Sequence, residues 1–407
     1  MPFAKFQKIT IVACICATAF LGGCGGGNSN NGSNKSVPPA SNSAAIVVNS
    51  GPTGNYANGL FTTVTICVPG TSTCQSIGGI LVDTGSFGLR ILSSALNASI
   101  SSALVPEKDS SGNTIVECAQ FSDGITWGPV ETADVKIAGE QASALPIQII
   151  GSPAFSSVPG GCSSAGAPED SLQKLATNGI LGIGNFVQDC PACSPGAVSN
   201  PGLYYGCVGS SCQVITVSLA QQVANPVASF GADSNGVIVE LPATASTTTV
   251  TGSLIFGIDT EDNNALGTAQ VLTIDPNTGN INTTFKSKTY TNAGFLDTGS
   301  NGFFFLDSTT TGLSSCPKPA NGFYCPASLT NLTATNTGTN KVATSVTFSV
   351  DNANSLFANG ANSVFPTLGG PLSGLFDWGL PFFYGRRVYV AIFGASTSGG
   401  VGPYWAY

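Results

Sequence analysis

Two stretches of the chain share one pattern: GGILVDTGSFGLRIL at residues 78–92 and NAGFLDTGSNGFFFL at residues 292–306. Each places Asp-Thr-Gly-Ser directly after a short apolar run, which is typical of a buried strand. The glycine permits a tight turn that leaves the carboxylate at the end of the strand. One such turn is common in proteins. Two turns with matching flanks predict two loops that face each other and bring together Asp83 and Asp297.

The repetition extends beyond the two motifs. Ile180-Leu181-Gly182 follows the first motif, and the run from Leu380 follows the second at a similar distance. An internal repeat of this kind indicates two homologous halves of similar size. We place an N-terminal β lobe at residues 46–250 and a C-terminal β lobe at residues 251–407.

The composition favours an all-β protein and restricts its chemistry. Only 8% of the residues are charged, and 51 glycines supply turns, which favours many strands over many helices. The formal net charge of −8 gives no attraction for nucleic acid. The chain contains no histidine, which excludes Ser-His-Asp and Cys-His nucleophiles and His-ligated metals. Acid-base chemistry near neutral pH therefore falls mainly to carboxylates.

The N-terminus is typical of an exported protein. Residues 1–23 carry two lysines and then an apolar run too short to span a membrane, which predicts a signal peptide. The sequence LGGC at residues 21–24 resembles the lipobox of bacterial lipoproteins. That resemblance implies that Cys24 is acylated and anchors the protein by lipid, at the bacterial outer membrane rather than the inner one because glycine follows it. Residues 24–45 lack an apolar period and are expected to form a flexible tether.

The other cysteines are expected to form disulfides. Ten of the 13 cysteines lie beyond residue 24, and an even number in an exported protein indicates disulfide bonds. The spacing predicts three local pairs: Cys67 with Cys74, Cys207 with Cys212, and Cys316 with Cys325. The remaining four, Cys118, Cys162, Cys190 and Cys193, can pair in several ways. An alternative is a zinc ribbon made by Cys190, Cys193, Cys207 and Cys212.

These features together resemble the pepsin-like aspartic peptidases, in which each lobe contributes one Asp-Thr-Gly loop and a later apolar-apolar-Gly strand that threads beside it. Residues 252–266 are similar to the segment that opens the second lobe in that family, and residues 386–394 are similar to its closing strand. The resemblance implies two pseudo-symmetric, curved antiparallel β lobes with a cleft between them. The chain also resembles a family of bacterial lipoproteins known as a domain of unknown function.

The resemblance assigns roles to the eight residues of the two motifs. It implies that Asp83 and Asp297 are the catalytic pair, which shares a proton because two close carboxylates cannot both ionise cheaply. It also implies that six neighbours support the pair: the threonines hold the two loops together, the glycines bring backbone amides near the carboxylates, and the serines donate to the outer carboxylate oxygens. These neighbours are Thr84, Gly85, Ser86, Thr298, Gly299 and Ser300.

Four positions depart from the family pattern. An ungapped alignment puts Phe121 where a flap hairpin presents a tyrosine, and Trp127 substitutes for it if the hairpin is shifted; ordinary packing is the alternative for both. Arg90 stands where the family usually has a tryptophan that supports the first aspartate. Pro381 stands where the second apolar-apolar-Gly strand should have its glycine.

The favoured hypothesis is an aspartic endopeptidase that activates water with Asp83 and Asp297 and needs no cofactor or metal. Its expected partner is a polypeptide substrate, and the protein is expected to be a monomer. The rival hypothesis is a catalytically inactive pepsin-like module that binds protein or carbohydrate at the cell envelope. A glycosidase with two carboxylates shares the chemistry but does not require two matching Asp-Thr-Gly turns.

Overall fold

The structure is a computed structural model, and it describes residues 41–407. The predicted signal peptide at residues 1–23, the lipidation site Cys24 and most of the predicted tether lie outside the described residues. Strand β1 begins at Ser43, so the tether expected to reach residue 45 ends slightly earlier. Between residues 41 and 407, no helix is both long and apolar enough to cross a membrane.

The larger of two main sheets has 16 strands and forms the N-terminal lobe and the junction between the lobes. The strands of the N-terminal lobe are β1 (Ser43–Asn49), β2 (Gly59–Cys67), β3 (Cys74–Asp83), β4 (Phe87–Leu92), β5 (Val105–Pro106), β6 (Thr114–Gln120), β7 (Ile125–Ile137), β8 (Glu140–Ile150), β9 (Gly179–Ile183), β10 (Tyr204–Val208) and β11 (Ser211–Val214). The same sheet continues with β12 (Gly236–Leu241), β13 (Val250–Phe256), β14 (Val271–Thr273), β22 (Arg386–Ala391) and β25 (Tyr404–Ala406).

The second sheet has seven strands and forms the C-terminal lobe. Its strands are β15 (Ile281–Phe285), β16 (Lys288–Leu296), β17 (Phe303–Leu306), β18 (Thr330–Thr337), β19 (Ala343–Val350), β20 (Gly369–Gly370) and β21 (Leu372–Trp378). A small hairpin joins β23 (Ser396–Thr397) to β24 (Gly400–Val401). The α-helices are all short: α1 (Ala98–Ser101), α2 (Gly160–Ser163), α3 (Leu172–Leu175), α4 (Ser308–Thr311) and α5 (Ala353–Phe357). The prediction of an all-β protein is confirmed.

The burial of each strand follows its sequence. Every residue of β9, Gly-Ile-Leu-Gly-Ile, is buried, as a short apolar run predicts for a strand covered on both faces. By contrast, alternate residues towards the end of β19 are buried, because one face of that strand packs on the core and the other is exposed to solvent. The strands that end near the acid loops are therefore held in the interior, and the strands at the periphery of the C-terminal lobe are half-buried.

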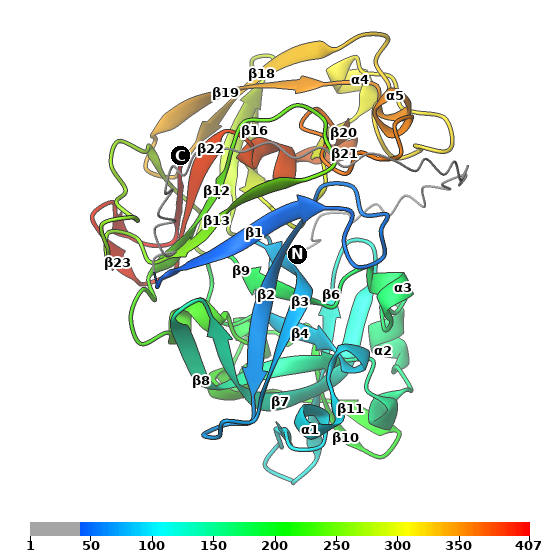
Figure 1. Cartoon of the computed structure of the whole chain (residues 1–407), viewed down its shortest axis with the longest axis vertical. Helices are drawn as coiled ribbons and strands as arrows, with labels where there is room; N and C mark the ends of the chain where they lie inside the picture. The colour runs from blue at the N-terminus through cyan, green and yellow to red at the C-terminus, as the bar shows by residue number, and fades with distance from the viewer. Residues whose placement is uncertain (1–40) are drawn as a thin grey trace, which may run out of the picture.

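The two lobes are joined by paired strands rather than by a loose linker. Strands β1, β13, β12 and β22 pair in that order and lie between the lobes (Figure 1). The predicted lobe boundary at residues 250 and 251 falls at the start of β13. Asn58 adds a polar connection: its amide donates to the carbonyls of Asn301 and Phe365 and accepts from the Phe365 amide and the Tyr384 hydroxyl. These contacts fix the position of the second acid loop relative to the first lobe.

Five disulfides close the described chain, and they settle the pairing that the sequence left open. The three predicted local pairs are present, and the other four cysteines form Cys118–Cys162 and Cys190–Cys193. The zinc-ribbon alternative is wrong, because its four cysteines are joined in two disulfides and have no thiolate left for a metal.

Candidate active site

The two Asp-Thr-Gly loops sit in equivalent frameworks. Asp83 is the last residue of β3, and β9 runs parallel to β3 with Asp83 opposite Gly182. Asp297 directly follows β16, and β21 runs parallel to β16 with Leu296 opposite Trp378. In each lobe the aspartate thus emerges at the end of a buried strand, with a second strand threaded beside it.

Four hydrogen bonds made by Thr84 and Thr298 lock the loops together. The Thr84 amide donates to the Thr298 hydroxyl at 3.1 Å, and the Thr298 amide donates to the Thr84 hydroxyl at 3.0 Å. Each hydroxyl then donates to a carbonyl of the opposite lobe, that of Leu296 at 3.0 Å or that of Val82 at 2.7 Å. Because each lobe supplies the same donors and acceptors, the contact is symmetric and fixes the relative position of the two aspartates.

Glycine and serine hold each carboxylate from its own loop. The Gly85 amide donates to Asp83 Oδ1 at 2.8 Å, and the Ser86 hydroxyl donates to Oδ2 at 2.5 Å. In the second loop, Gly299 donates to Asp297 Oδ1 at 2.8 Å. The Ser300 hydroxyl donates to Oδ2 of Asp297 at 2.7 Å. Hydrogen bonds to the charged form favour it, so these donors offset part of the cost of burying the carboxylates.

The two carboxyl groups are close and shielded from solvent. Asp83 is 3% exposed and Asp297 is 5% exposed. A methyl group on Gly85 would lie 2.6 Å from Asp297 Cγ, and one on Gly299 would lie 2.7 Å from Asp83 Oδ1, so only glycine fits at either position. Burial, followed by the charge of Asp83 and a hydrogen bond with it, raises the pKa of Asp297 well above its usual value. The pair therefore retains a proton at pH values where an isolated aspartate has none.

The glycine that supports the second acid loop is Gly379, which corrects the sequence interpretation of Pro381. The amide of Asp297 donates to the Trp378 carbonyl, so the residue beside the loop is Gly379. A methyl group there would lie 2.2 Å from the Gly302 carbonyl oxygen, whereas in the first lobe one on Gly182 would lie 2.6 Å from the Phe87 nitrogen. Both strands need glycine because the backbone of the acid loop crosses directly against them.

Asp377 is a third carboxyl group at the site, and sequence reasoning missed it. It lies on β21 opposite Phe295 of β16, two residues before Gly379, and is 1% exposed. Burial, then the charges of Asp297 and Asp83, raises the pKa of Asp377 well above its usual value, although the Ser300 hydroxyl partly offsets this. An alignment that placed Gly379 rather than Pro381 beside the loop would have identified it.

Phe121 lies at the turn of the hairpin formed by β6 and β7, where its amide donates to the Gly124 carbonyl. Its ring is buried in an apolar cluster with Leu175 and Ile180, so it covers the first lobe without a hydroxyl group. This hairpin is not free on both sides, because β6 also pairs with β10. The hairpin is therefore part of a larger sheet rather than an isolated flap.

Trp127 lies in β7 rather than at the turn. Its indole nitrogen donates to the Phe155 carbonyl, and its ring packs edge-on against Tyr205 in a cluster that contains the Cys118–Cys162 disulfide. The structure thus places Trp127 in ordinary packing and leaves Phe121 as the residue of the hairpin tip.

Arg90 belongs to a buried polar cluster that the sequence did not reveal. Its guanidinium is 3% exposed, forms an ion pair with Glu117 and contacts Asp189 at 3.0 Å. The Tyr204 hydroxyl donates to Asp189 at 2.6 Å. The guanidinium also lies 5.8 Å from the centre of the Phe121 ring, within the range of a cation–π contact. Arg90 therefore contacts the hairpin through its ion pair with Glu117 and its cation–π contact with Phe121, rather than through an aromatic side chain.

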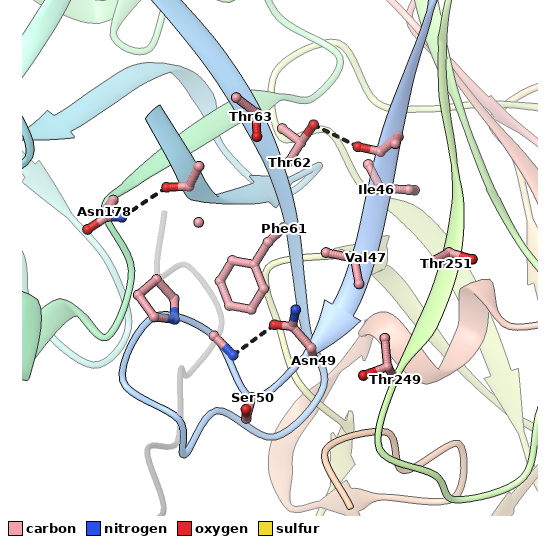
Figure 2. Close-up of a pocket in the computed structure, with 15 residues that line it drawn as sticks. Ile46, Val47, Asn49, Ser50, Phe61, Thr62, Thr63, Asn178, Thr249 and Thr251 are labelled. Carbon is pink, nitrogen blue, oxygen red and sulfur yellow. Dashed lines mark hydrogen bonds between the residues drawn. The ribbon is translucent and has the colours of Figure 1, made fainter. Parts of the chain in front are cut away.

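A groove of about 790 Å³ on strands β1, β2 and β3 is separate from the acid pair (Figure 2). Its wall carries threonine and asparagine side chains, including Thr62, Thr249 and Asn178, and the ring of Phe61 lies at its centre (Figure 2). The groove has no charged side chain in its lining, so it offers no group for acid-base catalysis. Within the described part of the chain, no cluster of three His, Cys, Asp or Glu residues is arranged to hold a metal ion.

The fold resembles the bilobal fold of the pepsin-like aspartic proteinases. The structure is similar to the crystal structure of an aspartic proteinase from Irpex lacteus, with a TM-score of 0.51 and 15% sequence identity over 89% of this chain and 96% of that one. The chain belongs to DUF3443, described as a protein of unknown function, whose family model matches residues 38–407. A search of curated proteins found no match.

Proposed function

We propose that this protein is an aspartic endopeptidase that hydrolyses peptide bonds with a water molecule activated by Asp83 and Asp297. The observation that carries the proposal is the symmetric pair of buried carboxyls, each held by the same glycine and serine donors and locked together by two threonines. A binding module would not require every donor of both loops to be retained.

The proposed chemistry requires one carboxyl of the pair to donate a proton and the other to accept one. Burial and the charge of Asp83 raise the pKa of Asp297, so we assign the donated proton to Asp297. The oxygen of a water between the carboxyls bonds to the peptide carbonyl carbon, while a water proton passes to the Asp83 carboxylate and the Asp297 proton passes to the carbonyl oxygen. The tetrahedral diol then breaks its carbon–nitrogen bond as Asp83 donates its proton to the nitrogen, and a diol hydroxyl returns a proton to Asp297. The products are a carboxylic acid and an amine.

Cleavage of an unfolded protein mixture tests the proposal. Residues 41–407 are produced in an oxidising compartment and assayed from acid to neutral pH, with Asp83→Asn and Asp297→Asn as inactive variants. Glu131→Gln is a matched control, because Glu131 is a half-buried carboxyl whose pKa, about 7, is raised by burial alone. We expect cleavage by the wild type and the control and none by the two variants. Absence of cleavage by folded wild type at every pH would favour the binding-module alternative.

We also propose that the mature protein is held at the bacterial outer membrane by lipid on Cys24 and works as a monomer. The support is the LGGC sequence at residues 21–24. Metabolic labelling with a fatty-acid analogue should mark the wild type but not Cys24→Ala, and the variant should move from the membrane fraction to the soluble fraction. Equal labelling of the two proteins would contradict the anchor.

A further inference from the structure

Asp377 lies on the face of β21 that is turned away from the main hydrophobic core. On β21 its neighbours Phe376 and Trp378 both belong to the main hydrophobic core, so the side chain between them points to the opposite face. Opposite Asp377 on β17 is Phe304, whose ring packs in a cluster with Ala57 of the first lobe. The Asp377 carboxyl is therefore directed to the same side of the sheet as the contact between the lobes.

The Asp377 carboxyl has no partner that satisfies it. Neither of its oxygens makes a hydrogen bond to a described residue, and no lysine or arginine between residues 41 and 407 forms an ion pair with it. The titratable groups that act on it are Asp297 and Asp83, both acidic, and the nearby Ser300 hydroxyl already donates to Asp297. A buried carboxyl of this kind is costly to keep unless a ligand completes it.

The equivalent position of the first lobe holds no charge. Ile180 lies two residues before Gly182, as Asp377 lies two residues before Gly379. Ile180 packs against Phe121 and Leu175 in an apolar cluster. One side of the acid pair is thus lined with hydrocarbon and the other with a carboxyl, so the two sides differ in the side chains that they can accommodate.

Other acidic groups surround the site. Burial raises the pKa of Tyr56 well above its usual value, and the carboxylates of Asp123, Glu169, Asp83 and Asp297 raise it further. Asp123 belongs to the hairpin turn that carries Phe121, and the Glu169 amide is bonded to β7 at the same hairpin. Four carboxyl groups from the two lobes therefore act on Tyr56, and two of them, Asp83 and Asp297, also act on Asp377. A field of this sign concentrates cationic ligands.

We propose that Asp377 is a specificity-determining residue that selects polypeptide substrates with a basic side chain next to the cleaved bond. The inference rests on the proposed peptidase function and defines its substrate class. A lysine or arginine side chain bound beside the acid pair should also reach Asp377, because Asp377 precedes the residue whose carbonyl accepts from the Asp297 amide, and the charges of Asp297 and Asp83 act on it. The cation supplies the donor that both Asp377 oxygens lack.

Binding of the cation is coupled to a proton. A buried carboxyl surrounded by acidic groups is protonated when the site is empty, and an opposite charge in contact with it favours the ionised form. The proton released by Asp377 passes to solvent as the ion pair forms. The preference for a basic side chain should therefore increase as the pH rises from acid to neutral, which a purely structural role of Asp377 would not produce.

Two series of short peptides test the inference. One series carries lysine at a single position that is varied along the peptide, and the other carries norleucine, which is uncharged and similar in size, at the same positions. We expect wild type to cleave the best lysine peptide with kcat/KM about 100-fold above its norleucine counterpart. Asp377→Asn, which keeps the size of the side chain, and Asp377→Ile, which copies Ile180, should reduce this ratio to near one. Glu131→Gln should leave it unchanged. An unchanged ratio in folded Asp377→Asn would overturn the inference.

Calorimetric binding of the same peptides to Asp83→Asn separates the inference from the proposed function, because binding needs no cleavage. In one outcome the wild type cleaves no peptide, yet Asp83→Asn binds lysine peptides more tightly than norleucine peptides, and adding Asp377→Asn abolishes that difference. The inference then stands and the hydrolysis proposal fails. If wild type cleaves peptides with equal efficiency for lysine and norleucine, the hydrolysis proposal stands and the inference fails.

Discussion

The two lobes repeat the acid loop but differ in the pair of residues that supports it. Seven residues after Asp83, Arg90 of β4 lies opposite Ile180 of β9. At the same distance after Asp297, Phe304 of β17 lies opposite Asp377 of β21. The first lobe therefore has a basic residue on β4 and an apolar residue on β9. At the equivalent positions the second lobe has an aromatic residue on β17 and an acidic residue on β21.

The comparison separates what the loops require from what their surroundings are free to vary. Hydrogen bonds to the opposite loop fix the threonines, close approach fixes the glycines, and hydrogen bonds to the aspartates fix the serines in both loops. The residues that support each loop, Arg90 with Ile180 and Phe304 with Asp377, make none of these bonds, so a basic or an acidic side chain can stand among them. In the first lobe the charge is balanced, because Arg90 meets Glu117 and Asp189. In the second lobe no described lysine or arginine forms an ion pair with Asp377, and neither of its oxygens has a hydrogen-bond partner.

Replacement of Arg90 should have the largest effect on stability. Arg90→Met keeps the length of the side chain but leaves the carboxyls of Glu117 and Asp189 buried without a cation, which should reduce the free energy of unfolding by about 3–5 kcal/mol. The loss should be smaller at acid pH, because burial and the charge of Glu117 raise the pKa of Asp189, which then holds a proton. Urea unfolding at acid and neutral pH measures both effects. A loss below about 1 kcal/mol at neutral pH would show that the cluster is not needed to support the first lobe.

The threonine contact tests whether the two loops are equivalent. Thr84→Val and Thr298→Val each leave an amide and a carbonyl of the opposite loop without a partner, which should cost about 1–3 kcal/mol each. Because the two side chains bond to the same pair of loops, the double variant should lose less than the sum. Strongly unequal losses of stability in the two single variants would show that the two loops are not equivalent.

Asp377→Asn should change how stability depends on pH. The pKa of Asp377 is raised in the folded protein, so its folded state keeps a proton that the unfolded chain releases above about pH 4. The wild type therefore loses up to about 1.4 kcal/mol per pH unit from this group as the pH rises above 4, and the loss stops above the folded pKa. An amide at this position does not titrate, so the variant should gain stability relative to wild type towards neutral pH. Parallel stability curves for the two proteins would contradict the raised pKa.

Replacement of Pro381 should have the smallest effect. Pro381 lies in the 3-10 helix Leu380–Phe383 rather than beside the acid loop, where Gly379 stands. Pro381→Ala should cost about 1 kcal/mol of stability through lost packing and should leave peptide cleavage within about twofold of wild type. Loss of most activity in the folded variant would restore Pro381 as part of the catalytic framework.

The sequence was sufficient to predict the parts of the molecule that are determined locally. The all-β fold follows from the short apolar runs, the glycines and the scarcity of charge, and the three local disulfides follow from the spacing of their cysteines. The contacts of Thr84 and Thr298 were expected only from the resemblance to the pepsin-like peptidases.

The contacts that the sequence did not reveal depend on pairing between distant segments. Arg90 of β4 meets Glu117 of β6 and Asp189, which follows β9, only when these distant segments pack together. Gly379 was missed because the apolar residues after it fit the expected pattern as well as those before it, and the register was visible only once β16 and β21 were paired. Asp377 was missed for the same reason.

The most direct test of the central claim is a comparison of Asp83→Asn, Asp297→Asn and the double variant in the peptide-cleavage assay. If the two carboxyls share one proton and act on one water, each single variant should lose activity by about 10³-fold or more, and the double variant should fall to the same background as the single variants. A single variant that retains substantial activity, or a double variant far below both, would mean that the two aspartates act independently and that the paired site is not the catalytic unit.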